Sequence, residues 1–297
     1  MTATATAGPV RERPADAPTP RRRGPRPTAG GVVLTALALL MAAAWLVPLL
    51  WALSTSVKPE EETRAIPPEW FASRVTGEAY GEAFGNSGLI RWFLNSTLVS
   101  VSVTLGVLVL CSLAAYGFSR TEFRGRRWLF APVVAAIIVP SQVLIIPLFD
   151  ELDALGLVDT YWAIILPQLV APAMVFILKK FFDAIPREYE EAAEIDGASR
   201  LRVFLTIVIP MSLPVLSAVG IFTFITTWNN FLLPFVVTTD PDLMTLPLGL
   251  LAGQTTFQLQ YAQVMALALL GGLPLLIIYV LFQRQVIRGV GSAGLKE

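Results

Sequence analysis

The side chains in this sequence with the clearest potential for chemistry are acidic, and they gather in one short segment. Carboxylates occupy four of the seven positions from Glu190 to Asp196, and Gly197 follows at once. Such a cluster can be an ordinary solvated surface or a surface that docks onto another protein. The 297-residue chain has no histidine and a single cysteine, Cys111, so it lacks the commonest metal ligand and general base and cannot form an internal disulfide. We therefore expect docking rather than catalysis, and no metal site.

The composition places this segment in a membrane protein. Hydrophobic residues make up 55% of the chain and charged residues only 15%, with a mean hydropathy of +0.64. Six apolar stretches, each near the length that crosses about 30 Å of hydrocarbon, predict six transmembrane helices in an all-α protein. These stretches lie near 30–53, 93–118, 128–149, 161–178, 204–237 and 264–283. Residues 1–29 are rich in Pro, Ala, Thr and Arg and predict a disordered basic tail, so the membrane domain is expected to cover 30–297.

The distribution of basic residues predicts the orientation of the chain. Of the 22 lysines and arginines, only Lys58, Arg64, Arg74 and Arg91 lie outside the tail, the loops after the second and fourth stretches, and the C-terminus. Basic residues mark the cytoplasmic side, so both termini and the acidic segment are expected in the cytoplasm.

The six apolar stretches contain no Asp, Glu, Lys or Arg. Ion-driven carriers usually need such groups for the coupling ion, so their absence disfavours a carrier that works alone. The sequence also lacks the Gly-x-x-x-x-Gly-Lys-Ser/Thr loop that cradles ATP. A transporter with neither charged residues in its spans nor an ATP-binding loop must obtain its energy from a partner ATPase.

Local signals predict a two-part helical element in the acidic segment, about 183–203. Pro186 suits the first turn of a helix, and the carboxylates that follow favour the positive end of its dipole. Ala192 and Ala193 are small enough for another surface to approach closely. Gly197 can adopt the left-handed conformation that ends a helix, and Ser199 can cap the next one.

The wider pattern resembles the permease subunits of carbohydrate-uptake ABC importers of the maltose type. Glu191-Ala192-Ala193 is followed by three residues and Gly197, then by nine residues and Ile207-Val208-Ile209-Pro210, as in that family's cytoplasmic coupling loop. The resemblance extends from about Trp51 to the C-terminus. Further family-like motifs are Ser56-Val57-Lys58-Pro59, Ala115 to Arg120, Pro140-Ser141-Gln142 and Trp228-Asn229-Asn230-Phe231.

The resemblance implies half of a pore, with the coupling helix between spans four and five. A second, homologous permease would complete the pore, and two cytoplasmic ABC ATPases would bind ATP and Mg²⁺, so that this chain is no enzyme and binds no cofactor. An external sugar-binding protein would deliver the sugar substrate, and nucleic acid has no role. The implied ATPase-coupling residues are Glu191, Ala192, Ala193, Asp196 and Gly197.

Polar side chains within the spans are candidates for the sugar pathway, since sugars require hydrogen-bonding groups and often an aromatic face. The candidates are Asn95, Gln142, Trp228, Asn229 and Asn230. The same side chains can instead join helices to one another or anchor a span at the membrane surface. Asn230 also departs from the family, in which Asp is more usual, so an ionic role at this position is in doubt.

Three other functions have to be weighed against a sugar permease. An ABC permease for a non-sugar solute would share the acidic loop but not the surrounding motifs. A stand-alone secondary carrier lacks charges in the spans. An intramembrane enzyme lacks a catalytic constellation there.

Overall fold

The computed structural model describes residues 29–85, 88–252 and 260–293. The predicted tail, residues 1–29, lies outside them except for its last residue, which begins the first helix. The chain divides into two units, residues 1–49 and 50–297, which are considered separately. Residues 29–49 form the first part of helix α1, and all other elements lie in the second unit.

All elements of the described residues are helical, as the composition predicts. The longer helices are α1 (Ala29–Ser56), α4 (Leu89–Arg120), α5 (Arg126–Ala136), α6 (Ile145–Ala154), α7 (Tyr161–Leu169), α8 (Pro172–Asp183), α12 (Leu213–Trp228) and α15 (Tyr261–Ala293). The shorter ones are α2 (Glu60–Thr63), α3 (Glu78–Gly85), η1 (Ser141–Leu144), α9 (Glu188–Ile195), α10 (Arg200–Val203), η2 (Phe204–Val208), α11 (Ile209–Met211), α13 (Leu232–Val237) and α14 (Leu246–Ala252).

Between four and six of the described segments can cross a membrane by length and composition. Four are long helical segments: Gly30–Ser56, Leu89–Arg120, Tyr161–Asp183, which comprises α7 and α8, and Tyr261–Gln283. The other two are bent pairs, Arg126–Ala136 with Ser141–Ala154 at 97° and Arg200–Met211 with Leu213–Trp228 at 78°. The stretches 128–149 and 204–237 are therefore not the continuous helices that their hydropathy suggests.

Proline accounts for both bends. Pro140 has no backbone N–H and disfavours the helical conformation at Val139. Helix α5 therefore ends before Pro140, and a 3₁₀ turn begins at Ser141. Pro210 and Pro214 lie in the first turns of α11 and α12, on either side of the break in the second pair. The five residues before α11, Phe204–Val208, form a π-helix, which is itself a common site of bending.

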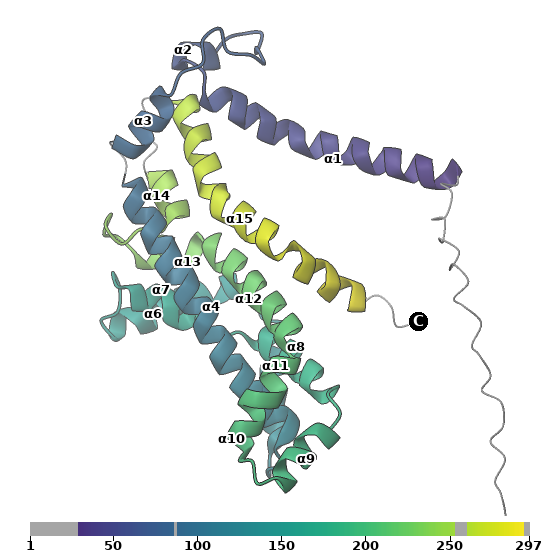
Figure 1. Cartoon of the computed structure of the whole chain (residues 1–297). Helices are drawn as coiled ribbons and strands as arrows, with labels where there is room; N and C mark the ends of the chain where they lie inside the picture. Colours follow the sequence, from purple (N-terminus) through teal and green to yellow (C-terminus); the bar gives the residue numbers. More distant parts are fainter. Residues whose placement is uncertain (1–28, 86–87, 253–259, 294–297) are drawn as a thin grey trace, which may run out of the picture. The chain divides into compact units, whose positions relative to one another are not determined.

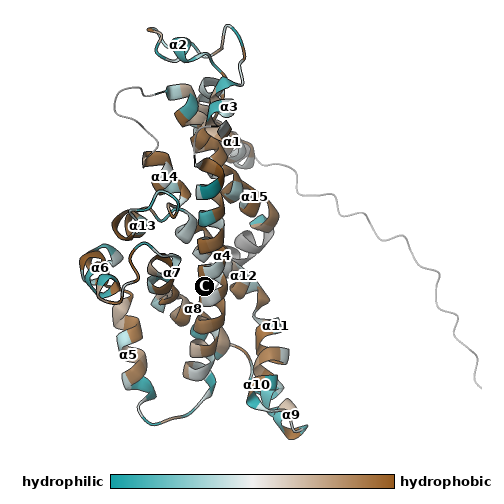
Figure 2. Ribbon diagram, turned by 90° about the vertical axis from the view of Figure 1, so that its left-hand side faces the viewer, coloured by the Kyte–Doolittle hydropathy of each residue, from teal (hydrophilic) through white to brown (hydrophobic). Residues whose placement is uncertain are grey.

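Helix α4 is the centre of the second unit. Its buried side chains, among them Val103, Val107 and Ala115, pack with side chains of α7, α8 and α12 in the largest apolar cluster. Figure 1 shows α9 and α10 beside the Arg120 end of α4 and α3 and α14 beside its Leu89 end. Figure 2 shows that α4, α12 and α15 are mostly hydrophobic, whereas hydrophilic residues colour α2, α3 and α10.

A carboxylate joins two loops of the second unit. Asp159 accepts hydrogen bonds from the Thr239 hydroxyl (2.6 Å) and from the backbone N–H groups of Thr239 (2.5 Å) and Asp240 (3.0 Å). The hydroxyl and then the two amides stabilise the charged form, which holds the pKa of Asp159 below its ordinary value. Asp159 has a positive φ of 57°, which Asp and Asn tolerate better than most residues.

The lowered pKa of Asp159 predicts a pH-dependent contribution to stability. A group with a depressed native pKa stabilises the fold above its unfolded pKa, about 3.9 for Asp, and this contribution is lost as the pH falls through the native value. Asp159→Asn keeps the backbone conformation and removes the charge. We expect a lower melting temperature than wild type at pH 7 and a shrinking difference below about pH 4. A difference that stays constant down to pH 3 in thermal unfolding of the purified protein would contradict this account.

The acidic segment folds much as its local signals predict. Helix α9 begins at Glu188, two residues after Pro186, and carries three glutamates in its first turn, near the positive end of the helix dipole. Gly197 has a φ of +82° and ends the element. The Ser199 hydroxyl then accepts a hydrogen bond from the N–H of Arg202 at 3.4 Å and caps α10.

Replacement of Gly197 tests whether the acidic segment requires the left-handed backbone conformation of this residue. A Cβ at Gly197 would meet no atom within 4 Å, so any cost of Gly197→Ala comes from the left-handed backbone alone, about 1–2 kcal/mol. Gly117→Ala is the matched control, because its Cβ also meets nothing and it lies inside helix α4. We expect faster amide exchange in α9 for Gly197→Ala and no increase for Gly117→Ala. Equal exchange in the two variants would show that the turn does not depend on glycine.

Candidate docking helix and translocation pocket

Helix α9 presents most of its side chains to the outside of this unit. Glu191, Ala192 and Asp196 are exposed, as is Gly197, and Ala193 is half-buried. The predicted coupling residues therefore lie in α9 and the two residues that follow it, and four of the five are accessible.

Large apolar side chains are exposed on the same acidic helix. Ile195 is 86% exposed and Tyr189 is 55% exposed. Apolar groups surrounded by carboxylates are typical of a surface that another protein covers. This arrangement can bind a complementary basic and apolar groove on a partner.

One residue of α9 differs from the rest. Among its eight residues, all of them described, only Glu190 is buried. Its Oε1 lies 2.7 Å from Nε of Arg120, the last residue of α4, and both side chains are at most 10% exposed. Arg120 also donates from Nη2 to the carbonyl of Ile185 at 2.7 Å, and the Tyr116 hydroxyl donates to Glu190 Oε2 at 3.4 Å. Sequence reasoning missed this ion pair, because nothing in the run Glu190-Glu191 indicates which carboxylate faces inward.

A second polar contact holds the chain just before α9. The Ser119 hydroxyl donates to Asp183 Oδ1 at 2.7 Å, and Lys179 pairs with Asp183 Oδ2 at the same distance. The last turn of α4 therefore contacts the end of α8 through Ser119 and contacts α9 through Arg120.

A polar pocket of about 630 Å³ brings together three of the five residues predicted for the substrate pathway. Gln142, Asn229 and Asn230 line it. The polar side chains that sequence reasoning missed are Ser141, Gln168, Thr223, Thr226 and Thr227. Gln168 is a single amide within the apolar stretch 161–178, a signal that could have identified it.

The amides in this pocket are only partly engaged by the protein. Asn230 donates from Nδ2 to Gln168 Oε1 at 3.0 Å, and Gln168 donates to the carbonyl of Ile164 at 2.8 Å. Asn229 donates to the carbonyl of Ile225 at 2.9 Å. Gln142 is exposed, and its side-chain amide forms no hydrogen bond with any described residue. The pocket can thus offer hydrogen bonds, but no formal charge, to a neutral polar solute.

Asn95 and Trp228 lie outside the residues that line this pocket. Asn95 is 4% exposed and its amide donates to the carbonyls of Asp242 (2.8 Å) and Met244 (2.9 Å), while its Oδ1 accepts from Tyr161 (2.8 Å). Trp228 is 3% exposed and its indole N–H donates to the carbonyl of Gly271 at 3.1 Å. Both side chains join helices and loops to one another in this structure.

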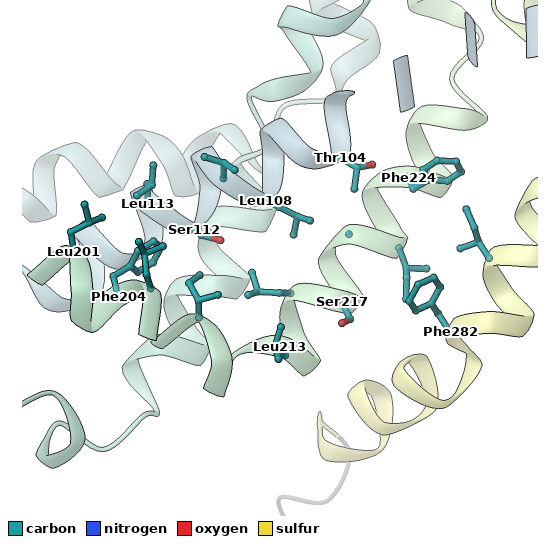
Figure 3. Close-up of a pocket in the computed structure, with 17 residues that line it drawn as sticks. Thr104, Leu108, Ser112, Leu113, Leu201, Phe204, Leu213, Ser217, Phe224 and Phe282 are labelled. Atoms are coloured by element: carbon teal, nitrogen blue, oxygen red, sulfur yellow. The ribbon is translucent and has the colours of Figure 1, made fainter. Parts of the chain in front are cut away.

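A larger cavity, of about 710 Å³, has a different chemistry. Figure 3 shows Thr104, Leu108 and Ser112 of α4 on one side of it and Phe282 of α15 on another. Its lining is almost wholly apolar, with hydroxyls only from Thr104, Ser112 and Ser217. It suits hydrocarbon rather than a polar solute. Within the described ranges, no three carboxylate or thiol groups gather closely enough to bind a metal ion.

Comparisons with known proteins identify the family. The family model described as "Binding-protein-dependent transport system inner membrane component" matches residues 107–290. The sulfoquinovosyl glycerol transport system permease protein SmoH of Agrobacterium fabrum is 34% identical over 253 residues, which cover 84% of this chain and 89% of SmoH. The trehalose/maltose transport system permease protein MalG of Thermococcus litoralis is 32% identical over 270 residues, which cover 89% of this chain and 96% of MalG.

A solved structure agrees in fold. A chain in the crystal structure of a bacterial ABC transporter involved in the import of the acidic polysaccharide alginate superposes with a TM-score of 0.75 at 20% identity, covering 86% of this chain and 95% of that one. The family match covers more than half of the sequence, and it includes α9 and the pocket residues from Gln142 onward. The chain belongs to the family of inner membrane permease components of binding-protein-dependent ABC transport systems, and it is a transport subunit rather than an enzyme.

Proposed function

We propose that this permease forms half of the translocation pore of an ATP-driven sugar importer, and that α9 couples the pore to a cytoplasmic ATPase. The observation that carries the coupling role is the exposure of α9. Ile195 and Tyr189 stand exposed among carboxylates on a helix whose single buried residue is Glu190. A free surface of this kind is costly unless a partner covers it.

The topology we propose has six spans, with each bent pair counted as one, and α9 in the loop between spans four and five. The Arg120 end of α4 lies beside α9, and the loop from Arg124 to Arg127 that follows it is basic. Basic loops favour the cytoplasmic side, so α9 and both termini would be cytoplasmic in a bacterial plasma membrane.

The partners we propose follow from the family. A second homologous permease would complete the pore, two cytoplasmic ABC ATPases would bind ATP and Mg²⁺, and an external sugar-binding protein would deliver the substrate. Closure of the ATPase dimer would move α9, and the spans would change from an inward-facing to an outward-facing arrangement. Glu191, Ala192, Ala193, Asp196 and Gly197 are the proposed docking residues.

The substrate we propose is a neutral sugar. Relatives are named as permeases for trehalose and maltose and, in Streptomyces coelicolor, for diacetylchitobiose (NgcG, 34% identical over 86% of this chain). Gln142, Asn229 and Asn230 would contact the sugar from the polar pocket, whereas Asn95 and Trp228 would support the pathway through the contacts that they make with neighbouring segments. A non-sugar solute is the second candidate, because amides and hydroxyls can also bind other neutral polar groups. The stand-alone carrier is disfavoured by the uncharged spans.

The docking role predicts that charge reversal at Glu191 separates the permease from its ATPase. Glu191→Lys places a cation where the partner offers a basic groove, and unpairing an interfacial charge costs about 2 kcal/mol or more, roughly 30-fold in affinity. Affinity purification from the native membrane, with mass spectrometry of the partners, measures the loss of ATPase. Glu151→Lys, on exposed helix α6, is the control and should keep the ATPase. Undiminished recovery of the ATPase with Glu191→Lys would overturn the docking assignment.

The pathway role predicts a selective loss of transport when the pocket amides are replaced. Gln142→Leu and Asn229→Leu each remove hydrogen bonds to the solute, and we expect uptake to fall about tenfold, or about 1.4 kcal/mol. Uptake of labelled trehalose and maltose into proteoliposomes that contain the complete transporter and its binding protein is the measurement. Thr104→Val, in the apolar cavity, is the control and should leave uptake unchanged. Equal effects of all three changes would remove the reason to place the solute in this pocket.

A further inference from the structure

We propose that the Arg120–Glu190 ion pair is the rigid link through which α9 moves helix α4, so that Arg120 and Glu190 are positioning residues for energy coupling. This inference rests on the proposed docking role of α9. It adds the route by which movement at the docking surface enters the membrane domain.

The first argument is that α9 has little other attachment to the core. Seven of its eight residues are not buried, and the eighth is Glu190. Its backbone is joined to the membrane helices only through the turns at 184–187 and 196–199, and the second of these depends on Gly197. The Arg120–Glu190 contact therefore decides whether α9 keeps a fixed orientation relative to α4.

The second argument is the choice of a charged pair. Burying two charges costs desolvation energy, and an apolar pair of similar size usually stabilises a fold as well or better. A buried pair does supply a defined geometry. Arg120 Nε lies 2.7 Å from Glu190 Oε1 as a charge pair without hydrogen-bond geometry, and Nη2 donates a hydrogen bond to the Ile185 carbonyl, so one guanidinium contacts both α9 and the turn before it.

The third argument is the position of the charges on their helices. Arg120 lies in the last turn of α4, where a cation is favoured, and Glu190 lies in the first turn of α9, where an anion is favoured. The dipole of each helix therefore stabilises the charge that this helix contributes to the pair.

The link continues from the end of α4 toward the pocket. Tyr116, one turn before Arg120, packs its ring against Phe204 of η2 with centroids 4.9 Å apart, so the end of α4 also contacts the chain after α9. Along its length α4 packs most extensively against α8 and α12. Helix α12 supplies Thr223, Thr226 and Thr227 to the polar pocket. A displacement of α9 that α4 follows would therefore reach the residues proposed to contact the solute.

The test measures whether α9 and α4 move as one body in the complete transporter. Spin labels are placed at Glu188→Cys on α9, outside the proposed docking residues, and at Leu110→Cys on α4, both at exposed positions, with Cys111→Ala removing the native thiol. Distances between the labels are recorded in nanodiscs without nucleotide and with Mg-ADP and vanadate. We expect the wild-type distance to be the same in the two states.

Variants of Arg120 and Glu190 test whether the fixed distance between the labels depends on the ion pair. With Arg120→Gln the distance should broaden and shift on addition of Mg-ADP and vanadate, because α9 follows the ATPase while α4 does not. Arg124→Gln, in the exposed part of the next loop, is the matched control and should behave as wild type. Arg120→Lys keeps the charge and should restore most of the fixed distance, which a general loss of stability would not do. Glu190→Gln breaks the pair from the other side and should give the same broadened and shifted distance. It keeps the test available if Arg120→Gln does not assemble.

The outcomes separate this proposal from the one on which it rests. If no ATPase accompanies the wild-type chain, the docking role fails and the link fails with it. If the ATPase is present but the wild-type distance shifts with nucleotide, or both Arg120→Gln and Glu190→Gln match the control, only the link is overturned.

Discussion

Helix α4 holds neighbouring segments through polar side chains at both of its ends, and most of the second unit is arranged around those contacts. At the Leu89 end, Trp92 and Asn95 donate to backbone carbonyls between Pro241 and Met244, and the Ser96 hydroxyl accepts from the N–H of Leu246. At the Arg120 end, Ser119 and Arg120 hold the chain from Asp183 to Glu190. Unpaired polar groups are costly in a bilayer, so these contacts fix which segments lie beside α4.

The two pockets follow from how the other helices pack on this one. Where α12 is continuous beside α4, the surface is apolar and the large cavity with Leu108 and Phe224 results. Where α12 ends at Trp228 and the chain turns through Asn229 and Asn230, freed polar groups face the break at Ser141 and form the polar pocket. Broken helices expose backbone and amide groups that a continuous helix would occupy, which is why solute sites in transport proteins often lie beside such breaks.

Local signals predicted part of this structure, and the limits are physical. Gly197 and Ser199 act through their own backbone and nearest neighbours, so their roles as helix end and cap could be recognised in the sequence. Hydropathy located the apolar stretches but not the bends, because it is averaged over a window and does not register the missing N–H of Pro140. Contacts such as Asn95 with Met244 join residues about 150 positions apart, and burial of Glu190 rather than Glu191 depends on a partner 70 positions away. A short sequence motif cannot specify contacts between residues that lie so far apart along the chain.

The absence of Asp, Glu, Lys and Arg from all six apolar stretches has an electrical consequence. A charge that moves through the membrane field exchanges about 2.3 kcal/mol per 100 mV with the potential, and a voltage-sensitive protein needs such charges within its spans. The apolar stretches of this subunit offer none, and the pocket amides are neutral. Reorientation of these spans around a neutral solute would therefore carry no gating current, and the rate of import would be independent of membrane voltage as far as this subunit determines it.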